Sequence, residues 1–285
     1  MPYPPAQDAE ESGAHLTVGG RGPHLNFIGR RLLYLIETVK GLGAFALISV
    51  GVACTKFRVA SRVIHPLIRQ QIYRDGVRLL PLVSFTALAL GFVVIGQTVT
   101  LLTRVGAQGW AGTIMVAVIV REVGPLTTAL LVLVRVGTGT VIELATARAM
   151  GEVNALEAMG IDPIHYLVVP RFWGLSLSIF ALSIYLILFA LIGGYLFAFL
   201  EDIPILPTEY VRQLAAALSW KDFVILAVKT TSFGGIIAVV TCHAGLAKPL
   251  LLENVSSVAT SAVVLSLGLC IGVDALFIIS YLITP

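Results

Sequence analysis

Hydrophobic positions dominate the chain from residue 79 onward and form long uninterrupted stretches separated by short polar segments. A helix needs about 20 consecutive apolar residues to cross the hydrocarbon core of a bilayer. The pattern therefore predicts five transmembrane helices. They cover residues 79–102, a region that runs with interruptions from Gly112 to about Ala147, 174–200, 223–244 and 258–283.

The region before the first span has a different pattern. Residues 1–25 are polar and rich in Pro and Gly, which is typical of a disordered tail. Residues 26–40 and 56–78 carry basic residues opposite an apolar face, as helices in a membrane interface do. Residues 41–55 are apolar but too short for a regular span, so they predict a re-entrant or shallow segment.

The predicted organisation therefore has three parts: a tail at 1–25, interfacial helices at 26–78 and a five-span membrane domain at 79–285. Of the residues, 57% are apolar and only 12% are charged, against roughly 25% charged in soluble domains. This composition predicts an all-α integral membrane protein. The small net charge of +3 gives no indication of nucleic-acid binding.

The distribution of Lys and Arg predicts the orientation. Ten of the nineteen lie before the first span, and the segment 148–172 is flanked by Arg148 and Arg171. Cytoplasmic segments are enriched in Lys and Arg, so the N-terminus and 148–172 are expected in the cytoplasm. Five spans then place the C-terminus on the opposite side of the membrane.

A short acidic segment, GEVNALEAMG at 151–160, interrupts the apolar sequence on the cytoplasmic side. Val153, Leu156 and Met159 recur at helical spacing, and Gly160 is a typical helix terminator. Such a helix either docks into a groove on a soluble partner or is an ordinary solvated connector.

The stretch from Arg121 to Phe172 resembles the central signature of the MlaE-type permease family, the membrane subunits of ABC transporters that work with MCE proteins in phospholipid trafficking. The matching motifs are EVGP at 122–125, RVG at 135–137, IEL at 142–144, GEVNALEAMG at 151–160, DP at 162–163 and PRF at 170–172. The resemblance implies a bacterial inner-membrane permease with a periplasmic C-terminus, which moves phospholipid or a similar lipid.

The resemblance also implies the partners. They are a second permease copy forming a homodimer, a cytoplasmic ATPase dimer that binds ATP and Mg, and a periplasmic MCE-domain protein in a ring. In this family the segment between spans two and three is the coupling helix. Glu152 and Glu157 would then meet basic groups on the ATPase, and Leu156 and Met159 would fill its groove.

Six charged residues fall within the predicted spans, and the four farthest from the cytoplasmic ends call for an explanation, because a charge in the membrane is costly. Arg121 and Glu122 lie near the middle of span two, beside Pro125, which frees a backbone carbonyl one turn earlier. They are expected to line a polar cavity, or to lock helices together as an ion pair. Lys229 and Asp274 lie at similar depths in spans four and five and are expected to form a buried ion pair.

The lipid cavity is expected to use large apolar residues of span one, with Arg121 and Glu122 on its wall. The span-one residues are Phe92, Ile95, Val99 and Leu102. A diacyl lipid needs a wide apolar cavity, and two copies around a two-fold axis would enclose one.

Enzyme chemistry gains no support from the sequence. The run GTGT at 137–140 lacks the GK[ST] ending of a phosphate loop, and no zinc, metal-ligand or Ser/His/Asp pattern is visible. We therefore expect a non-catalytic subunit with no cofactor of its own. Two alternatives are a secondary transporter or channel that uses the intramembrane charges, and a membrane enzyme of lipid metabolism.

Overall fold

The computed structural model describes residues 41–49, 51, 61–201, 207–246 and 255–283. The chain divides into two units, Met1–Gly41 and Leu42–Pro285, and the following description concerns the second. The expected tail at 1–25 and the expected interfacial helix at 26–40 lie outside the described residues.

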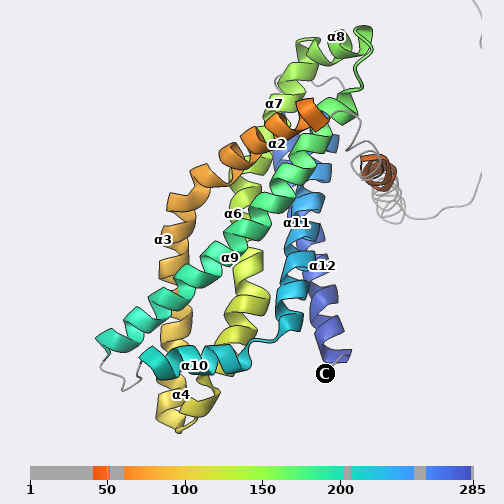
Figure 1. Cartoon of the computed structure of the whole chain (residues 1–285). Helices are drawn as coiled ribbons and strands as arrows, with labels where there is room; N and C mark the ends of the chain where they lie inside the picture. Colours follow the sequence, from red (N-terminus) through yellow and green to blue (C-terminus); the bar gives the residue numbers. More distant parts are fainter. Residues whose placement is uncertain (1–40, 50, 52–60, 202–206, 247–254, 284–285) are drawn as a thin grey trace, which may run out of the picture. The chain divides into compact units, whose positions relative to one another are not determined.

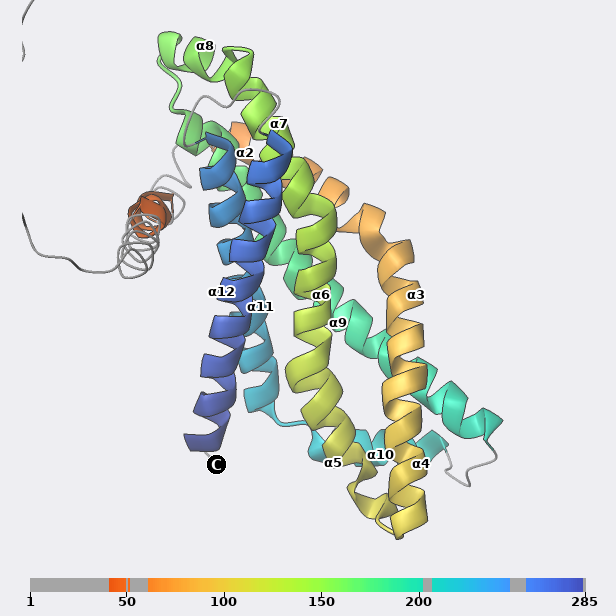
Figure 2. The same cartoon turned by 180° about the vertical axis from the view of Figure 1, so that it is seen from behind.

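The described part is an all-α integral membrane fold with five helices long and apolar enough to cross a membrane, which confirms the predicted spans. Figures 1 and 2 show these helices side by side, with α8 at one end of the bundle and α10 at the other. We refer to these as the α8 end and the α10 end. The candidate spans are His65–Val105, Ala111–Ala149, Ile164–Leu200, Trp220–Leu246 and Val255–Tyr281.

The first two spans are built from several helical segments. The first consists of α2 (Ser61–Asp75), η1 (Val77–Leu79), α3 (Leu80–Leu90), the π-helical η2 (Gly91–Ile95) and α4 (Gly96–Val105). After η3 (Gln108–Trp110), the second consists of α5 (Ala111–Met115), the π-helical η4 (Val116–Val123), α6 (Gly124–Val132), the π-helical η5 (Leu133–Gly137) and α7 (Thr138–Ala149).

The remaining spans are more regular. The third span consists of η6 (Ile164–Val168) and α9 (Val169–Leu200), the fourth is α11 (Trp220–Leu246) and the fifth is α12 (Val255–Ile283). The short helices α8 (Glu152–Ala158) and α10 (Pro207–Ala217) precede the third and the fourth span. The predicted polar segment 201–222 thus contains a helix, α10, that the hydrophobic pattern did not indicate.

The first span begins earlier than its apolar stretch, because the basic, amphipathic residues of α2 continue into it through η1. Figure 1 shows α2 crossing the α8 end at an angle to α3. Gly76 separates α2 from η1, and a Cβ atom there would come within 2.7 Å of the Ile72 carbonyl oxygen and 3.1 Å of Ser178 Oγ. The segment predicted as interfacial and the first span are therefore consecutive parts of one helical run.

Residues 41–49 are helical, and Leu42 is buried in a cluster with Val141, Val240 and Ala259. These residues come from α7, α11 and α12. The described part of the expected re-entrant segment at 41–55 thus packs against the bundle and is not among the candidate spans found in the described residues.

Helix α9 is central, and contacts α2, α3, α6 and α11. Small residues allow these close contacts, as in other membrane bundles. A Cβ atom on Gly91 would lie 1.9 Å from the Ala190 carbonyl oxygen, and one on Gly234 would lie 2.4 Å from Ser176 Cα.

We predict that Gly91→Ala destabilises the protein by about 1–3 kcal/mol, because the added methyl group would press backbone against backbone between η2 and α9. Gly268→Ala is the matched control, since its Cβ would meet nothing within 4 Å. Thermal unfolding of the detergent-solubilised variants measures the difference. Equal midpoints for both variants would show that α9 does not need this close approach.

Candidate functional site

A buried lysine on α11 organises the first candidate site. Lys229 is 1% exposed and lies nine residues after Trp220, so its Cα is about 14 Å from the start of α11. Its Nζ lies 2.8 Å from Glu122 Oε2 and 2.6 Å from Asp274 Oδ1. The structure therefore brings together the expected Lys229–Asp274 pair and adds Glu122 from the second span.

A third contact of Lys229 follows from a proline. Pro125 has no amide hydrogen, so the carbonyl of Arg121, four residues earlier, has no ordinary helical donor. Lys229 Nζ donates a hydrogen bond of 2.8 Å to this Arg121 oxygen. Pro125 thus leaves a backbone carbonyl of the π-helical η4 free to accept a hydrogen bond from the buried ammonium group.

Arg121 turns its side chain to a different partner, Asp222 at the beginning of α11. Its Nε lies 2.9 Å from Asp222 Oδ1, and its guanidinium carbon lies 5.0 Å from the centre of the Tyr281 ring. Asp222 also accepts hydrogen bonds from the Ser219 amide at 2.9 Å and from the Tyr281 hydroxyl at 3.2 Å. Arg121 is thus held by electrostatic contacts to both α11 and α12.

These contacts define what we call the ion cluster: Arg121, Glu122, Asp222, Lys229, Asp274 and Tyr281. Sequence reasoning missed Asp222 and Tyr281, because both lie near span ends where polar residues are common. The spacing of Asp222 and Lys229 offered a signal, since residues seven apart lie on the same face of a helix. Glu122 and Arg121 keep side-chain exposures of 30% and 33%, so the cluster is open on one side in the single chain.

The expected acyl-chain residues occupy two different environments. Ile95 and Val99 are 1% and 2% exposed and belong to a core cluster with residues of α5, η4, α9 and α10. The expectation that they line an open cavity was therefore wrong for the single chain. The structure buries them because Gly194 on α9 allows Ile95 to pack tightly against it.

Phe92 and Leu102 are more accessible. Phe92 is 40% exposed and makes an edge-to-face contact with Phe197, with ring centres 4.8 Å apart. Leu102 is partly buried against the same core as Ile95. Of the four expected acyl-chain residues, Phe92 therefore presents the clearest surface to a lipid.

Helix α8 forms the second candidate site, and Figure 2 shows it at the far end of α7. Gly151, with φ of 80°, precedes it. At its end Gly160 has φ of 75°, and the Gly160 and Ile161 amides donate to Glu157 and Leu156. This is the geometry of a glycine-terminated helix, which confirms the predicted end of α8 at Gly160.

The residues of the predicted apolar stripe of α8 differ in exposure. Val153 is 2% exposed and packs with Leu144, Val168, Cys242 and Leu246. Met159 is 66% exposed, Leu156 is half-buried, and Glu152 and Glu157 are exposed. Val153 thus anchors α8 to the bundle. The two glutamates, together with Leu156 and Met159, form an accessible acidic and apolar surface.

A polar network ties α7 to α2 and α9 beside this helix. Glu143 Oε2 lies 3.0 Å from Arg74 Nη1, and Glu143 Oε1 lies 2.8 Å from Arg171 Nη2. Arg74 also contacts Asp75 at 3.3 Å, and Asp75 accepts a hydrogen bond from Gln71. Arg148 donates to the carbonyl of Leu246, which adds a link to α11.

Helix α10 packs across the opposite end. The Tyr210 hydroxyl donates a hydrogen bond of 2.9 Å to the Leu191 carbonyl, and burial raises the pKa of Tyr210. Partly exposed Glu209 accepts hydrogen bonds from Arg212 and Gln213, which lower the pKa of its carboxyl group. The helix is thus anchored by an aromatic residue on one face and solvated on the other.

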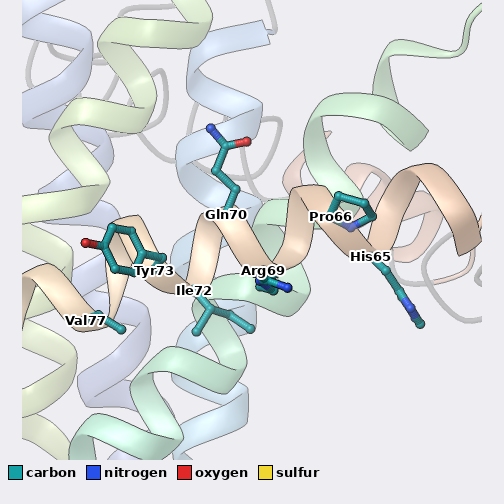
Figure 3. Close-up of a pocket in the computed structure, with 7 residues that line it drawn as sticks. All are labelled: His65, Pro66, Arg69, Gln70, Ile72, Tyr73 and Val77. Carbon is teal, nitrogen blue, oxygen red and sulfur yellow. The ribbon is translucent and has the colours of Figure 1, made fainter.

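An open groove of about 810 Å³ runs along α2 and η1. Its lining residues are His65, Pro66, Arg69, Gln70, Ile72, Tyr73 and Val77, and Figure 3 shows them distributed along successive turns. Polar and apolar groups alternate along a groove that belongs to a single helical run. This mixture is typical of a helix at a membrane surface.

The part of the chain that the structure describes contains no group of three or more His, Cys, Asp or Glu residues that could hold a metal ion.

We predict that Lys229→Met destabilises the protein by about 3 kcal/mol, because it leaves the Glu122 and Asp274 carboxylates without their cation. The triple variant Lys229→Met, Glu122→Gln, Asp274→Asn should be more stable than this single variant, since it removes the stranded charges as well. Thermal unfolding in detergent checks the order, with exposed Lys221→Met as the control. A triple variant less stable than the single one would contradict charge pairing as the function of Lys229.

Comparison with known proteins agrees with this architecture. Residues 68–280 match the family described as Permease MlaE. A probable ABC transporter permease protein of Rickettsia typhi is 31% identical over 84% of this chain and 90% of its own length. The chain is also similar to the intermembrane phospholipid transport system permease protein MlaE of Haemophilus influenzae, at 29% identity over 60% of this chain and 65% of that protein.

A third relative comes from a plant. Protein TRIGALACTOSYLDIACYLGLYCEROL 1, chloroplastic, of Arabidopsis thaliana is 30% identical over 70% of this chain and 56% of its own length. The family match covers all five candidate spans except the first residues of the first and the last residue of the fifth. This multi-pass membrane protein therefore belongs to the MlaE permease family.

Proposed function

We propose that this chain is the permease subunit of an ABC transporter that moves phospholipid between the inner membrane and an MCE-domain protein. A separate cytoplasmic ATPase drives the cycle. The observation that carries the proposal is α8, a two-turn helix anchored by buried Val153, which presents Glu152, Glu157 and Met159 at the end of the bundle. An accessible helix with an acidic and apolar surface suits a groove on a soluble partner.

The orientation follows from the same proposal. The α8 end faces the cytoplasm and the ATPase, while α10 and the C-terminal end of α12 face the periplasm and the MCE partner. The basic residues support this orientation, because α2 with Arg69 and Arg74 lies at the α8 end, and positive charge is concentrated on cytoplasmic segments.

Phospholipid as the cargo rests on the family and on two features of the bundle. The Haemophilus relative is a phospholipid transport permease by name. The ion cluster is accessible at Arg121 and Glu122, and Phe92 offers an exposed aromatic surface on the first span. A second copy around a two-fold axis would enclose such surfaces, as a diacyl lipid requires.

The alternatives are a secondary transporter or channel and a lipid-metabolising enzyme. A transporter that binds its coupling ion at Lys229 would need this group free during the cycle, whereas two carboxylates and a carbonyl surround it. The contacts therefore favour a structural role for Lys229, and the ABC permease remains the function that the geometry supports best.

We predict that the double variant Glu157→Lys, Met159→Lys loses ATPase association at least about tenfold, because it reverses the charge and removes the apolar contact of α8. Co-purification of the ATPase with the solubilised permease measures it. The control is Glu209→Lys, which reverses a partly exposed charge on α10. Equal ATPase recovery with the wild type, the double variant and the control would show that α8 is not the docking helix.

For the cargo, we predict that a photo-crosslinking residue at Phe92 captures phospholipid with a yield that changes when the ATPase is trapped with nucleotide. A residue at Phe85, which is 74% exposed on the same span, should capture bilayer lipid equally in both states. The comparison separates cargo from surrounding lipid by mass spectrometry of the adducts. If the crosslinking yield at Phe92 does not change with the nucleotide state, cargo does not pass along this face.

A further inference from the structure

A second pocket, of about 320 Å³, lies at the α8 end between α2–η1 and η5–α7, apart from the ion cluster. The residues around it are Arg74, Asp75, Arg78, Leu79, Arg135, Val136, Gly139, Thr140 and Glu143. Three arginines and two carboxylates share a small volume. The charge that is left for a ligand therefore depends on which of these groups already form ion pairs.

The carboxylates of this pocket already have cationic or amide partners. Asp75 is 1% exposed and accepts from Gln71 and Arg74. Glu143 accepts from Arg74 and from Arg171, which lies outside this pocket. The acidic groups are therefore neutralised by Arg74 and Arg171.

Arg78 and Arg135 remain as the positive charge of the pocket. Both are exposed, and neither forms an ion pair within the described residues. Arg78 has one oriented contact, with its guanidinium carbon 5.9 Å from the centre of the Tyr73 ring. Such a contact leaves the edge of the guanidinium, with its N–H donors, available to an anion.

The level of these two arginines in the membrane follows from the sequence. Arg78 directly precedes the uncharged residues 79–103 of the first span, and Arg135 directly follows the uncharged residues 123–134 of the second. Because they line one pocket, the two uncharged stretches end at the same level. That level is where lipid phosphates lie, since the hydrocarbon core tolerates few charges.

We propose that Arg78 and Arg135 bind the phosphate of an anionic phospholipid in the leaflet at the α8 end, which is the cytoplasmic leaflet under the proposed function. Guanidinium groups donate paired hydrogen bonds to phosphate oxygens. Leu79 and Val136 form apolar walls beside them, where the glycerol and acyl chains leave the pocket toward the bilayer. Basic pockets between helices on the cytoplasmic side are suited to anionic head groups.

Native mass spectrometry of the purified permease, titrated with phosphatidylglycerol, tests this assignment. Arg78→Gln and Arg135→Gln should each weaken binding of the first lipid by about tenfold, the worth of one charge-assisted hydrogen bond. The matched control, Arg104→Gln, removes an exposed arginine at the opposite end of the same span and should leave binding unchanged. Phosphatidylcholine with the same acyl chains should bind the wild-type protein more weakly.

Three outcomes would overturn the assignment: equal phosphatidylglycerol binding by all four proteins, equal binding of the two lipids, or displacement of the lipid by inorganic phosphate at similar concentrations. The last would identify the pocket as a site for a free anion. The permease alone is titrated, so a failure of ATPase association, which would undermine the proposed transporter, is measured separately. Circular dichroism and ATPase co-purification of the variants show that they fold.

Discussion

The fold depends on keeping one ammonium group satisfied inside the membrane. Lys229 is 1% exposed, and an isolated charge at that depth would cost several kcal/mol. Its three oxygen partners come from the second and fifth spans, while the lysine itself lies on the fourth. The requirement therefore fixes α11 against η4 and α12, and it explains why a proline sits at residue 125, where it frees the Arg121 carbonyl.

Close helix contacts make this arrangement possible. Gly234 on α11 approaches the backbone of Ser176 on α9, and Gly91 approaches Ala190 of the same helix. Without a hydrophobic driving force between helices in lipid, such close packing and polar contacts hold a membrane bundle together. Helix α9 thus positions both α3 and α11, and through α11 the lysine that organises the ion cluster.

The sequence was sufficient for the five spans, because length and hydropathy alone determine which segments cross a membrane. It also predicted the pairing of Lys229 with Asp274, because similar depth in neighbouring spans limits the possible partners. It failed for Ile95 and Val99, since an all-apolar span does not indicate which face meets protein and which meets lipid. It also missed α10, because a polar, amphipathic helix outside the bilayer leaves no strong hydropathy signal.

The bundle therefore contains two polar layers, and each connects a different set of helices. The ion cluster near the α10 end connects α11, α12 and η4 through direct contacts. The Glu143 network near the α8 end connects α7 with α2 and α9. Between them α6 contributes no charged residue, and its buried side chains pack with those of α3, α9 and α11.

The connection between the layers runs through the helical segments of the second span. Helix α8 is joined to α7 by a single turn and anchored by Val153, so a displacement of α8 acts on α7 and on its partners Arg74 and Arg171. The same span continues through η5, α6 and η4 to Arg121 and Glu122. Close-packed helices transmit strain because their interiors have little free volume. The second span therefore joins the exposed surface of α8 to the ion cluster, where Glu122 and the Arg121 carbonyl contact Lys229.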